Sequence, residues 1–290
     1  MPVTVKPLHP LIGAEISGFD MRKPVDATSL KEIVTAMDRW AVGVFRNPAP
    51  LSDEQHIAFS RQLGPIQKSE VLMVEGRKPR LPYGEIIDQS NLDHRGEIFA
   101  ENDKLLLYKR ANQLWHTDMS FHPVRATYSL LSAHLTPPGG ADTEFADMRA
   151  AYDALSGAMK AKLEGLVAEH SYWHSRVVAG GPEPTAAERN SRPPARHPLV
   201  HVHPGSKRKA LYLASHASHI VDWPVEEGQA LLRELTQHAT QPQFVYRHAW
   251  QLGDVVAWDN LCTMHRATPF DDTTHRRDMR RTTVREATVA

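Results

Sequence analysis

Residues 243–258 have the sequence QFVYRHAWQLGDVVAW, and this stretch decides the fold class. Two short segments of strand character, Gln243–Trp250 and Asp254–Trp258, lie on either side of a break that contains Gly253. Aromatic and β-branched residues between turn residues are typical of β-strands. Segments of the same kind occur at Ala41–Phe45, Thr127–Leu135, Lys209–Ala214 and Arg281–Val284. Strands therefore dominate the second half of the predicted fold.

Helix signals lie near the start and in the middle of the chain. Apolar residues at helical spacing or capping residues predict helices over Ser29–Trp40, from Ser52 onward, over Asp147–Leu155 and Ala158–His170, and from Pro224 to near His238. Strands and helices do not alternate regularly, which disfavours a doubly wound parallel sheet. We therefore predict an α+β, mainly β fold: a double-stranded β-helix (jelly roll) core with added helices.

Composition narrows the class of protein. The 290 residues carry 34 basic and 34 acidic side chains, so no basic field favours a nucleic-acid partner. No apolar run approaches the length of a membrane span, and the single cysteine excludes an intramolecular disulfide. We expect a soluble, cytoplasmic protein with one domain over residues 1–290. Within it, residues 67–110 lack periodicity and are predicted to form long loops or a mobile lid.

Seventeen histidines beside one cysteine make a histidine-ligated metal the first site to consider. His116 and Asp118 would project from the same face of an extended segment, since side chains alternate along a strand. His265, shortly after the predicted strand 254–258, is the candidate for a third ligand. Two histidines and one carboxylate suit non-haem Fe(II) chemistry. A His-x-Asp pair alone is more often a surface polar pair or a hydrogen-bonded core histidine than part of a metal site.

Further motifs accompany these three residues in a characteristic order. A Trp-His-x-Asp pair at 115–118 is followed by Gly-Gly-x-x-Thr-x-Phe at 139–145, Trp-Asp-Asn at 258–260, and Arg-x-x-x-Arg-Thr-Thr at 277–283. In this order the chain resembles the 2-oxoglutarate-dependent dioxygenases of the taurine and 2,4-dichlorophenoxyacetate type. The phenoxyacetate branch is the more similar, and the resemblance is weakest over residues 67–110 and 171–195.

The resemblance implies roles for single residues. Fe(II) would be bound by His116, Asp118 and His265, with 2-oxoglutarate and O2 as co-substrates and ascorbate as a stimulant. Thr143 and Arg277 would hold the distal carboxylate of 2-oxoglutarate, since an arginine fork grips a carboxylate with two parallel bonds. Eleven residues separate His265 from Arg277, one more than the family pattern, so Arg276 remains the alternative.

The substrate follows from the same resemblance. An aryloxyacetate such as 2,4-dichlorophenoxyacetate would be hydroxylated at the ether-linked carbon, giving a phenol and glyoxylate together with succinate and CO2, as in phenoxyacetate degradation. Residues predicted to contact substrate are Asn112, His203, His216 and Arg281. The alternatives are the same chemistry on a taurine-like sulfonate or another small carboxylate, a zinc hydrolase, and a non-catalytic jelly-roll binding protein. A homo-oligomer is expected from the family.

Overall fold

The computed structural model describes residues 2–68, 79–100, 103, 109 and 111–287. Its strands are β1 (Thr4–Pro7), β2 (Ala14–Ser17), β3 (Val42–Phe45), β4 (Ile87–Asp88), β5 (Ala126–Leu135), β6 (Thr143–Asp147), β7 (Val167–His170), β8 (Ala195–Pro198), β9 (Val200–Val202), β10 (Lys209–Leu211), β11 (Ala217–Ile220), β12 (Val245–His248), β13 (Val255–Asp259), β14 (Thr263–Ala267) and β15 (Asp278–Arg285). Its α-helices are α1 (Ala27–Trp40), α2 (Asp53–Leu63), α4 (Met148–Asp153), α5 (Gly157–Leu163), α6 (Tyr172–Val178), α7 (Ala186–Ser191) and α8 (Val225–Ala239), with short 3-10 turns η1 (Ala111–Gln113) and η2 (Pro242–Phe244).

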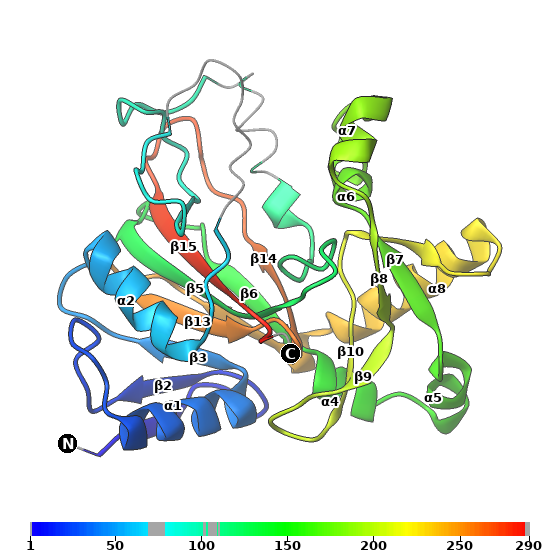
Figure 1. Cartoon of the computed structure of the whole chain (residues 1–290), viewed down its shortest axis with the longest axis horizontal. Helices are drawn as coiled ribbons and strands as arrows, with labels where there is room; N and C mark the ends of the chain where they lie inside the picture. The colour runs from blue at the N-terminus through cyan, green and yellow to red at the C-terminus, as the bar shows by residue number, and fades with distance from the viewer. Residues whose placement is uncertain (1, 69–78, 101–102, 104–108, 110, 288–290) are drawn as a thin grey trace.

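A seven-stranded sheet in the order β1-β2-β3-β13-β5-β15-β4 forms the larger layer. Along β13, Val255 and Ala257 belong to one apolar cluster, whereas Val256 and Trp258 belong to another. This alternation shows that both faces of the sheet are buried. Helices α1 and α2 cover one face, as the blue segments of Figure 1 show. The other face packs against the smaller sheet of the core.

The smaller sheet of the core has the order β12-β6-β14 and is antiparallel throughout. Phe145 on β6 and Met264 on β14 are buried in the same cluster as Val256 and Trp258 of the larger sheet. The larger sheet is also antiparallel except for the pair β2–β3, which is parallel. Two largely antiparallel sheets packed face to face are the arrangement expected of a jelly roll. The predicted fold class is thereby confirmed.

Residues 148–239 form an additional region beside the two core sheets (Figure 1). A three-stranded sheet, β11-β7-β8, and the β10-β9 hairpin lie here with helices α4 to α8. Leu231, Leu232 and Leu235 of α8 join the same apolar cluster as the core sheets. In the part of the chain that the structure describes, no helix is long and apolar enough to cross a membrane.

Most predicted helices are observed close to their expected bounds, but one is wrong. The helix predicted over Ala158–His170 ends at Leu163, and Val167–His170 is strand β7. Gly165 adopts a φ of 74°, a left-handed conformation that cannot continue a right-handed helix. Strand β7 then pairs with both β8 and β11. Apolar spacing alone could not separate the helix from the strand that follows it.

Two other local expectations need revision. His116 was expected in an extended strand with Asp118, but it forms an isolated bridge with His265 and Asp118 begins a turn. Within the predicted loop region 67–110, Ile87–Asp88 forms the edge strand β4. The lid itself stays a prediction, because residues 69–78, 101–102, 104–108 and 110 lie outside the described residues.

Candidate active site

The three predicted metal ligands, His116, Asp118 and His265, meet between the two core sheets. His265 lies on β14, and its backbone exchanges two hydrogen bonds with His116, at 2.9 and 2.8 Å. The two rings are therefore neighbours, with centroids 4.1 Å apart. Asp118 completes the group at 3.9 Å from Nε2 of His116 and 3.8 Å from Nε2 of His265. One ligand atom from each residue lies within 4.8 Å of the others, and all three residues are buried.

The charge states of this group suit a divalent metal. Burial lowers the pKa of His116, and burial together with the His116 ring lowers the pKa of His265 well below its usual range. Burial alone raises the pKa of Asp118, but Arg281 and the two imidazoles reverse this and hold it well below its ordinary value. The Nδ1 atom of His116 lies 2.8 Å from the carbonyl of Leu114, which leaves Nε2 free to bind a metal. Two neutral imidazoles and one carboxylate are the donor set of a facial iron site.

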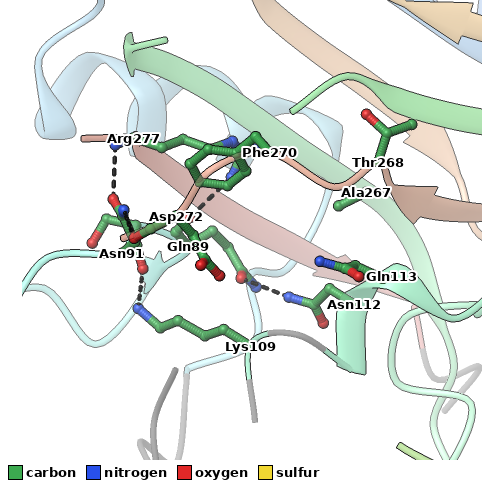
Figure 2. Close-up of a pocket in the computed structure, with 11 residues that line it drawn as sticks. Gln89, Asn91, Lys109, Asn112, Gln113, Ala267, Thr268, Phe270, Asp272 and Arg277 are labelled. Atoms are coloured by element: carbon green, nitrogen blue, oxygen red, sulfur yellow. Dashed lines mark hydrogen bonds between the residues drawn. The ribbon is translucent and has the colours of Figure 1, made fainter. Parts of the chain in front are cut away.

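A cavity lies next to the end of β14, the strand that carries His265, and Ala267 is one of the residues that line it (Figure 2). Its polar lining comes largely from segments that adjoin β4 and η1. The residues that line it are Gln89, Ser90, Asn91, Lys109, Asn112, Gln113, Ala267, Thr268, Phe270, Asp272 and Arg277. Amide groups, two cations and the carboxylate of Asp272 therefore surround the space, and the excess of positive charge favours an anionic ligand.

Arg277 contributes the guanidinium group of this cavity. Its guanidinium is buried and donates to the carbonyl of Gln89 at 3.1 Å. No carboxylate forms an ion pair with it among the residues that the structure describes, and burial lowers its pKa to about 10. A buried guanidinium without an acidic partner is costly, so the chemistry of the site fits a bound carboxylate at this position.

The neighbouring arginine has a different environment. Arg276 is half-exposed and pairs with Glu97 at 2.9 Å, on the surface of the protein. Arg277 precedes β15, and its backbone makes two hydrogen bonds with Asn91. Its N–H donates to Oδ1 of Asn91 at 2.8 Å, and its carbonyl accepts from the backbone N–H of Asn91 at 3.2 Å. Thr143, the other predicted 2-oxoglutarate contact, is buried on β6 opposite Ala267, and its hydroxyl accepts from Trp250 at 3.0 Å. That bond leaves the hydroxyl proton of Thr143 able to donate.

The predicted substrate contacts do not all lie together. Arg281 reaches the ligand group itself, since its Nη1 lies 2.5 Å from Oδ1 of Asp118. His216 is buried beside it, with its ring 6.3 Å from that of His116. Asn112 lines the cavity of Arg277 and donates to Gln89 at 3.0 Å, as Figure 2 shows. Arg281 and His216 therefore lie beside the three ligands, whereas Asn112 lies in the cavity of Arg277.

His203 belongs to a separate buried group with Asp259 and Cys262, whose ligand atoms also lie within 4.8 Å. Its Nε2 lies 2.8 Å from Asp259, and its Nδ1 accepts from the backbone of Ser206 at 2.9 Å. Burial raises the pKa of the Cys262 thiol well above its ordinary value. With both ring nitrogens occupied and a protonated thiol, this group is a saturated structural cluster. The substrate role predicted for His203 stays a prediction.

Several residues of the site carried no predicted role. Gln89 and Asn91 lie in the stretch without periodicity, so only the folded chain brings them to Arg277. Ser129 donates to Asp118 at 2.7 Å, yet an isolated serine in a strand gives no signal in the sequence. Asn260 was visible within Trp-Asp-Asn, and its position next to a strand end could have indicated a supporting role.

Comparison with known proteins shows the family to which the chain belongs. The protein-family description "Taurine catabolism dioxygenase TauD, TfdA family" matches residues 4–283. The chain is 45% identical to an alpha-ketoglutarate-dependent 2,4-dichlorophenoxyacetate dioxygenase of Cupriavidus pinatubonensis over 289 residues, which is 100% of both chains. It is 34% identical to an (S)-phenoxypropionate/alpha-ketoglutarate-dioxygenase of Sphingobium herbicidovorans, covering 94% of this chain and 91% of that one.

A solved structure is similar over nearly the whole length. The crystal structure of AAD-2 in complex with Mn(II) and N-oxalylglycine has a TM-score of 0.90 and 42% identity, with 98% of this chain and 97% of that chain covered. A metal and 2-oxoglutarate are the cofactor and co-substrate of this chain's family, and the cluster of His116, Asp118 and His265 agrees with a bound metal. The chain belongs to the TauD/TfdA family of 2-oxoglutarate-dependent dioxygenases.

Proposed function

We propose that this dioxygenase hydroxylates an aryloxyacetate such as 2,4-dichlorophenoxyacetate at the carbon next to the ether oxygen. The product is a hemiacetal that collapses to a phenol and glyoxylate, while 2-oxoglutarate is converted to succinate and CO2. The observation that carries the proposal is the 45% identity to a 2,4-dichlorophenoxyacetate dioxygenase over the full length of both chains. A solved taurine dioxygenase of Burkholderia xenovorans is less similar, at 30% identity.

We assign the metal to His116, Asp118 and His265, and the distal carboxylate of 2-oxoglutarate to Arg277 with Thr143. The buried, unpaired guanidinium of Arg277 supports this choice over Arg276, which already pairs with Glu97. When bound, ferrous iron supplies the activation of O2. The chain supplies the donor atoms, excludes water by burial, and fixes the orientation of the two organic acids.

The substrate carboxylate needs a second cation, and Arg281 lies closest to the three ligands. Its place against Asp118 supports the assignment, because a substrate anchored there would hold its reacting carbon beside the metal. His216 would assist Arg281. The ring of Phe121 packs against the rings of His216 and Tyr172, with centroids 5.0 and 5.2 Å away, respectively. These rings support an aromatic substrate in preference to a small zwitterion.

The test is a panel of substrates under Fe(II), ascorbate and 2-oxoglutarate, with succinate and phenol measured. Aryloxyacetates should give both products in equal amounts, and taurine should give neither sulfite nor succinate above the background. Restoration of activity by Fe(II), with inhibition by Zn(II), would distinguish the dioxygenase from a zinc hydrolase. Oxygen uptake that depends on substrate would exclude a binding protein without turnover.

The proposal includes a cytoplasmic location and a homo-oligomeric state. A ferrous enzyme suits the reducing conditions of the cytosol, and oligomers are expected from the family. Cell fractionation tests the first. Analytical ultracentrifugation of the purified protein tests the second, since a single species at 32.6 kDa would contradict it.

A further inference from the structure

The carboxylate of Asp118 is held by a hydroxyl group from the larger sheet. Ser129, on β5, donates from Oγ to Oδ2 of Asp118 at 2.7 Å. Ser129 is fully buried, and its backbone pairs with Trp258 on one side and Thr283 on the other. The donor therefore comes from the centre of a sheet, where a side chain has little freedom to move.

Asn260 fixes the direction of this hydrogen bond. Its Oδ1 accepts from the backbone N–H of Asp118 at 3.2 Å and from Nε1 of Trp258 at 3.1 Å. Both partners are donors only, so the oxygen of the amide must face them. The amide nitrogen consequently faces Ser129, to which it donates at 3.0 Å. Ser129 must then accept from Asn260 and give its own proton to Asp118.

The result is a closed loop of hydrogen bonds around one ligand. Asn260 holds the backbone of Asp118 directly and its carboxylate through Ser129. The next residue, Met119, has a φ of 56°, a left-handed conformation that a side chain disfavours. The hydrogen bonds to the backbone N–H and to the carboxylate of Asp118 together stabilise this turn. An Asp118 carboxylate without a partner would not stabilise it.

We propose that Ser129 and Asn260 are positioning residues that hold Asp118 ready to bind the metal. The inference rests on the proposed role of Asp118 as a ligand. Asn260 orients the Ser129 hydroxyl, and that hydroxyl occupies one lone pair of Oδ2, while Arg281 donates to Oδ1. The carboxylate therefore keeps one rotamer, and its remaining lone pairs are left for a metal shared with the two imidazoles. Partners of this kind orient the ligand and strengthen metal binding without touching the metal.

The test is metal affinity, measured by titrating the purified apoprotein with Mn(II). Ser129→Ala should weaken Mn(II) binding by about 10- to 100-fold, the range found for lost supporting hydrogen bonds. The Co(II)-loaded variant should also show altered visible absorption, because the carboxylate is free to change its mode of binding. A role confined to stability would lower the melting temperature and leave both readouts unchanged in the folded protein.

Ser132 provides a matched control on the same strand. It is fully buried like Ser129, but its hydroxyl has no hydrogen-bond partner within the described residues. Ser132→Ala removes the same atom from β5 and should leave Mn(II) affinity within about threefold, or 0.65 kcal/mol, of the original protein. An equal loss of affinity in Ser132→Ala and Ser129→Ala would overturn the proposal.

Asn260→Asp tests the direction of the bonds with little change of shape. A carboxylate in this place cannot donate to Ser129, so the serine proton turns toward it and away from Asp118. We expect a loss of affinity of the same order as in Ser129→Ala. The double variant with Asn260→Asp and Ser129→Ala should bind Mn(II) about as weakly as Ser129→Ala alone, because the bond that both changes affect is already lost. Additive losses would contradict the relay through Ser129.

The outcomes separate this inference from the proposed function. If the unaltered protein does not bind Mn(II), or binds it equally well after Asp118→Ala, the ligand assignment itself fails. If Asp118→Ala abolishes binding while Ser129→Ala binds Mn(II) with unchanged affinity and an unchanged Co(II) spectrum, the ligand assignment holds and the positioning role is wrong.

Discussion

Arg281 donates from Nη1 to Oδ1 of Asp118 at 2.5 Å, so the cation assigned to the substrate contacts a residue assigned to the metal. Both side chains are largely buried. Among the described residues, the guanidinium of Arg281 is therefore the counter-charge in direct contact with the Asp118 carboxylate. A bound metal would take over that part and make Arg281 available to an organic anion, which links metal loading to substrate binding.

This link predicts how Arg281→Ala changes stability. The apoprotein should lose about 3–5 kcal/mol of unfolding free energy, because a buried carboxylate is left without its partner. Saturating Mn(II) should recover most of that loss, since the metal supplies the missing positive charge. Thermal melts with and without Mn(II) measure the difference.

Arg280→Ala is the control for that experiment. Arg280 lies on the same strand but pairs with Asp53 at 2.8 Å and with Asp278 at 3.1 Å, away from the metal ligands. Its removal should lower the melting temperature by the same amount with and without Mn(II). Equal shifts for Arg281→Ala in the two conditions would show that Arg281 does not exchange places with the metal.

The ligand assignment predicts the effect of three single changes. His116→Ala, Asp118→Ala and His265→Ala should each remove nearly all turnover and leave a folded protein, because each removes a donor atom. Succinate release measures turnover, and circular dichroism measures folding. Substantial succinate release by His265→Ala would mean that the third ligand is misassigned.

The co-substrate assignment predicts a difference between adjacent arginines. Arg277→Ala should raise the concentration of 2-oxoglutarate needed for half-maximal rate by roughly 30- to 5,000-fold, since losing a buried charged partner costs roughly 2–5 kcal/mol. Arg276→Ala, which breaks only the surface pair with Glu97, should leave it nearly unchanged. The reverse order of effects would move the assignment to Arg276.

A buried histidine outside the active site predicts a pH dependence of stability. Burial, and then the neighbouring His197, lower the pKa of His170 from 6.5 to about 3. The unfolded chain therefore takes up a proton at His170 between pH 6.5 and about 3 while the folded chain does not, so stability falls as the pH falls through this window. Chemical denaturation at a series of pH values should show a shallower fall for His170→Phe.

The exposed residue His94 gives the comparison. His94→Phe makes the same substitution at a histidine in contact with solvent, so it controls for the effect of replacing an imidazole with a phenyl ring. A slope that is the same in His170→Phe as in the unaltered protein would show that His170 is not the group responsible.

The sequence was sufficient to predict the jelly-roll class and the cluster of His116, Asp118 and His265. The strands could be predicted because strand composition is a local property of the sequence, and the ligands could be predicted from the order of the motifs. The sequence was insufficient where a contact depends on tertiary structure. Gln89 and Asn91 reach Arg277 across β4, and Ser129 reaches Asp118 from a different strand. Such contacts are set by sheet register, which has no signature in a single chain.

The helix predicted through His170 shows a second limit. Leu163 and Leu166 fit a helical stripe, yet Gly165 ends the helix and β7 is completed by hydrogen bonds from β8 and β11. Strand partners distant in the sequence decided between two structures that the local pattern could not separate.

The central claim is that this dioxygenase acts on aryloxyacetates, and the most direct test is product formation from two competing substrates. The purified protein is supplied with Fe(II), ascorbate, 2-oxoglutarate and O2, together with equal amounts of 2,4-dichlorophenoxyacetate and taurine. We predict that 2,4-dichlorophenol and glyoxylate appear in step with succinate and that no sulfite is released. Efficient sulfite release from taurine, with no phenol from the aryl ether, would contradict the account.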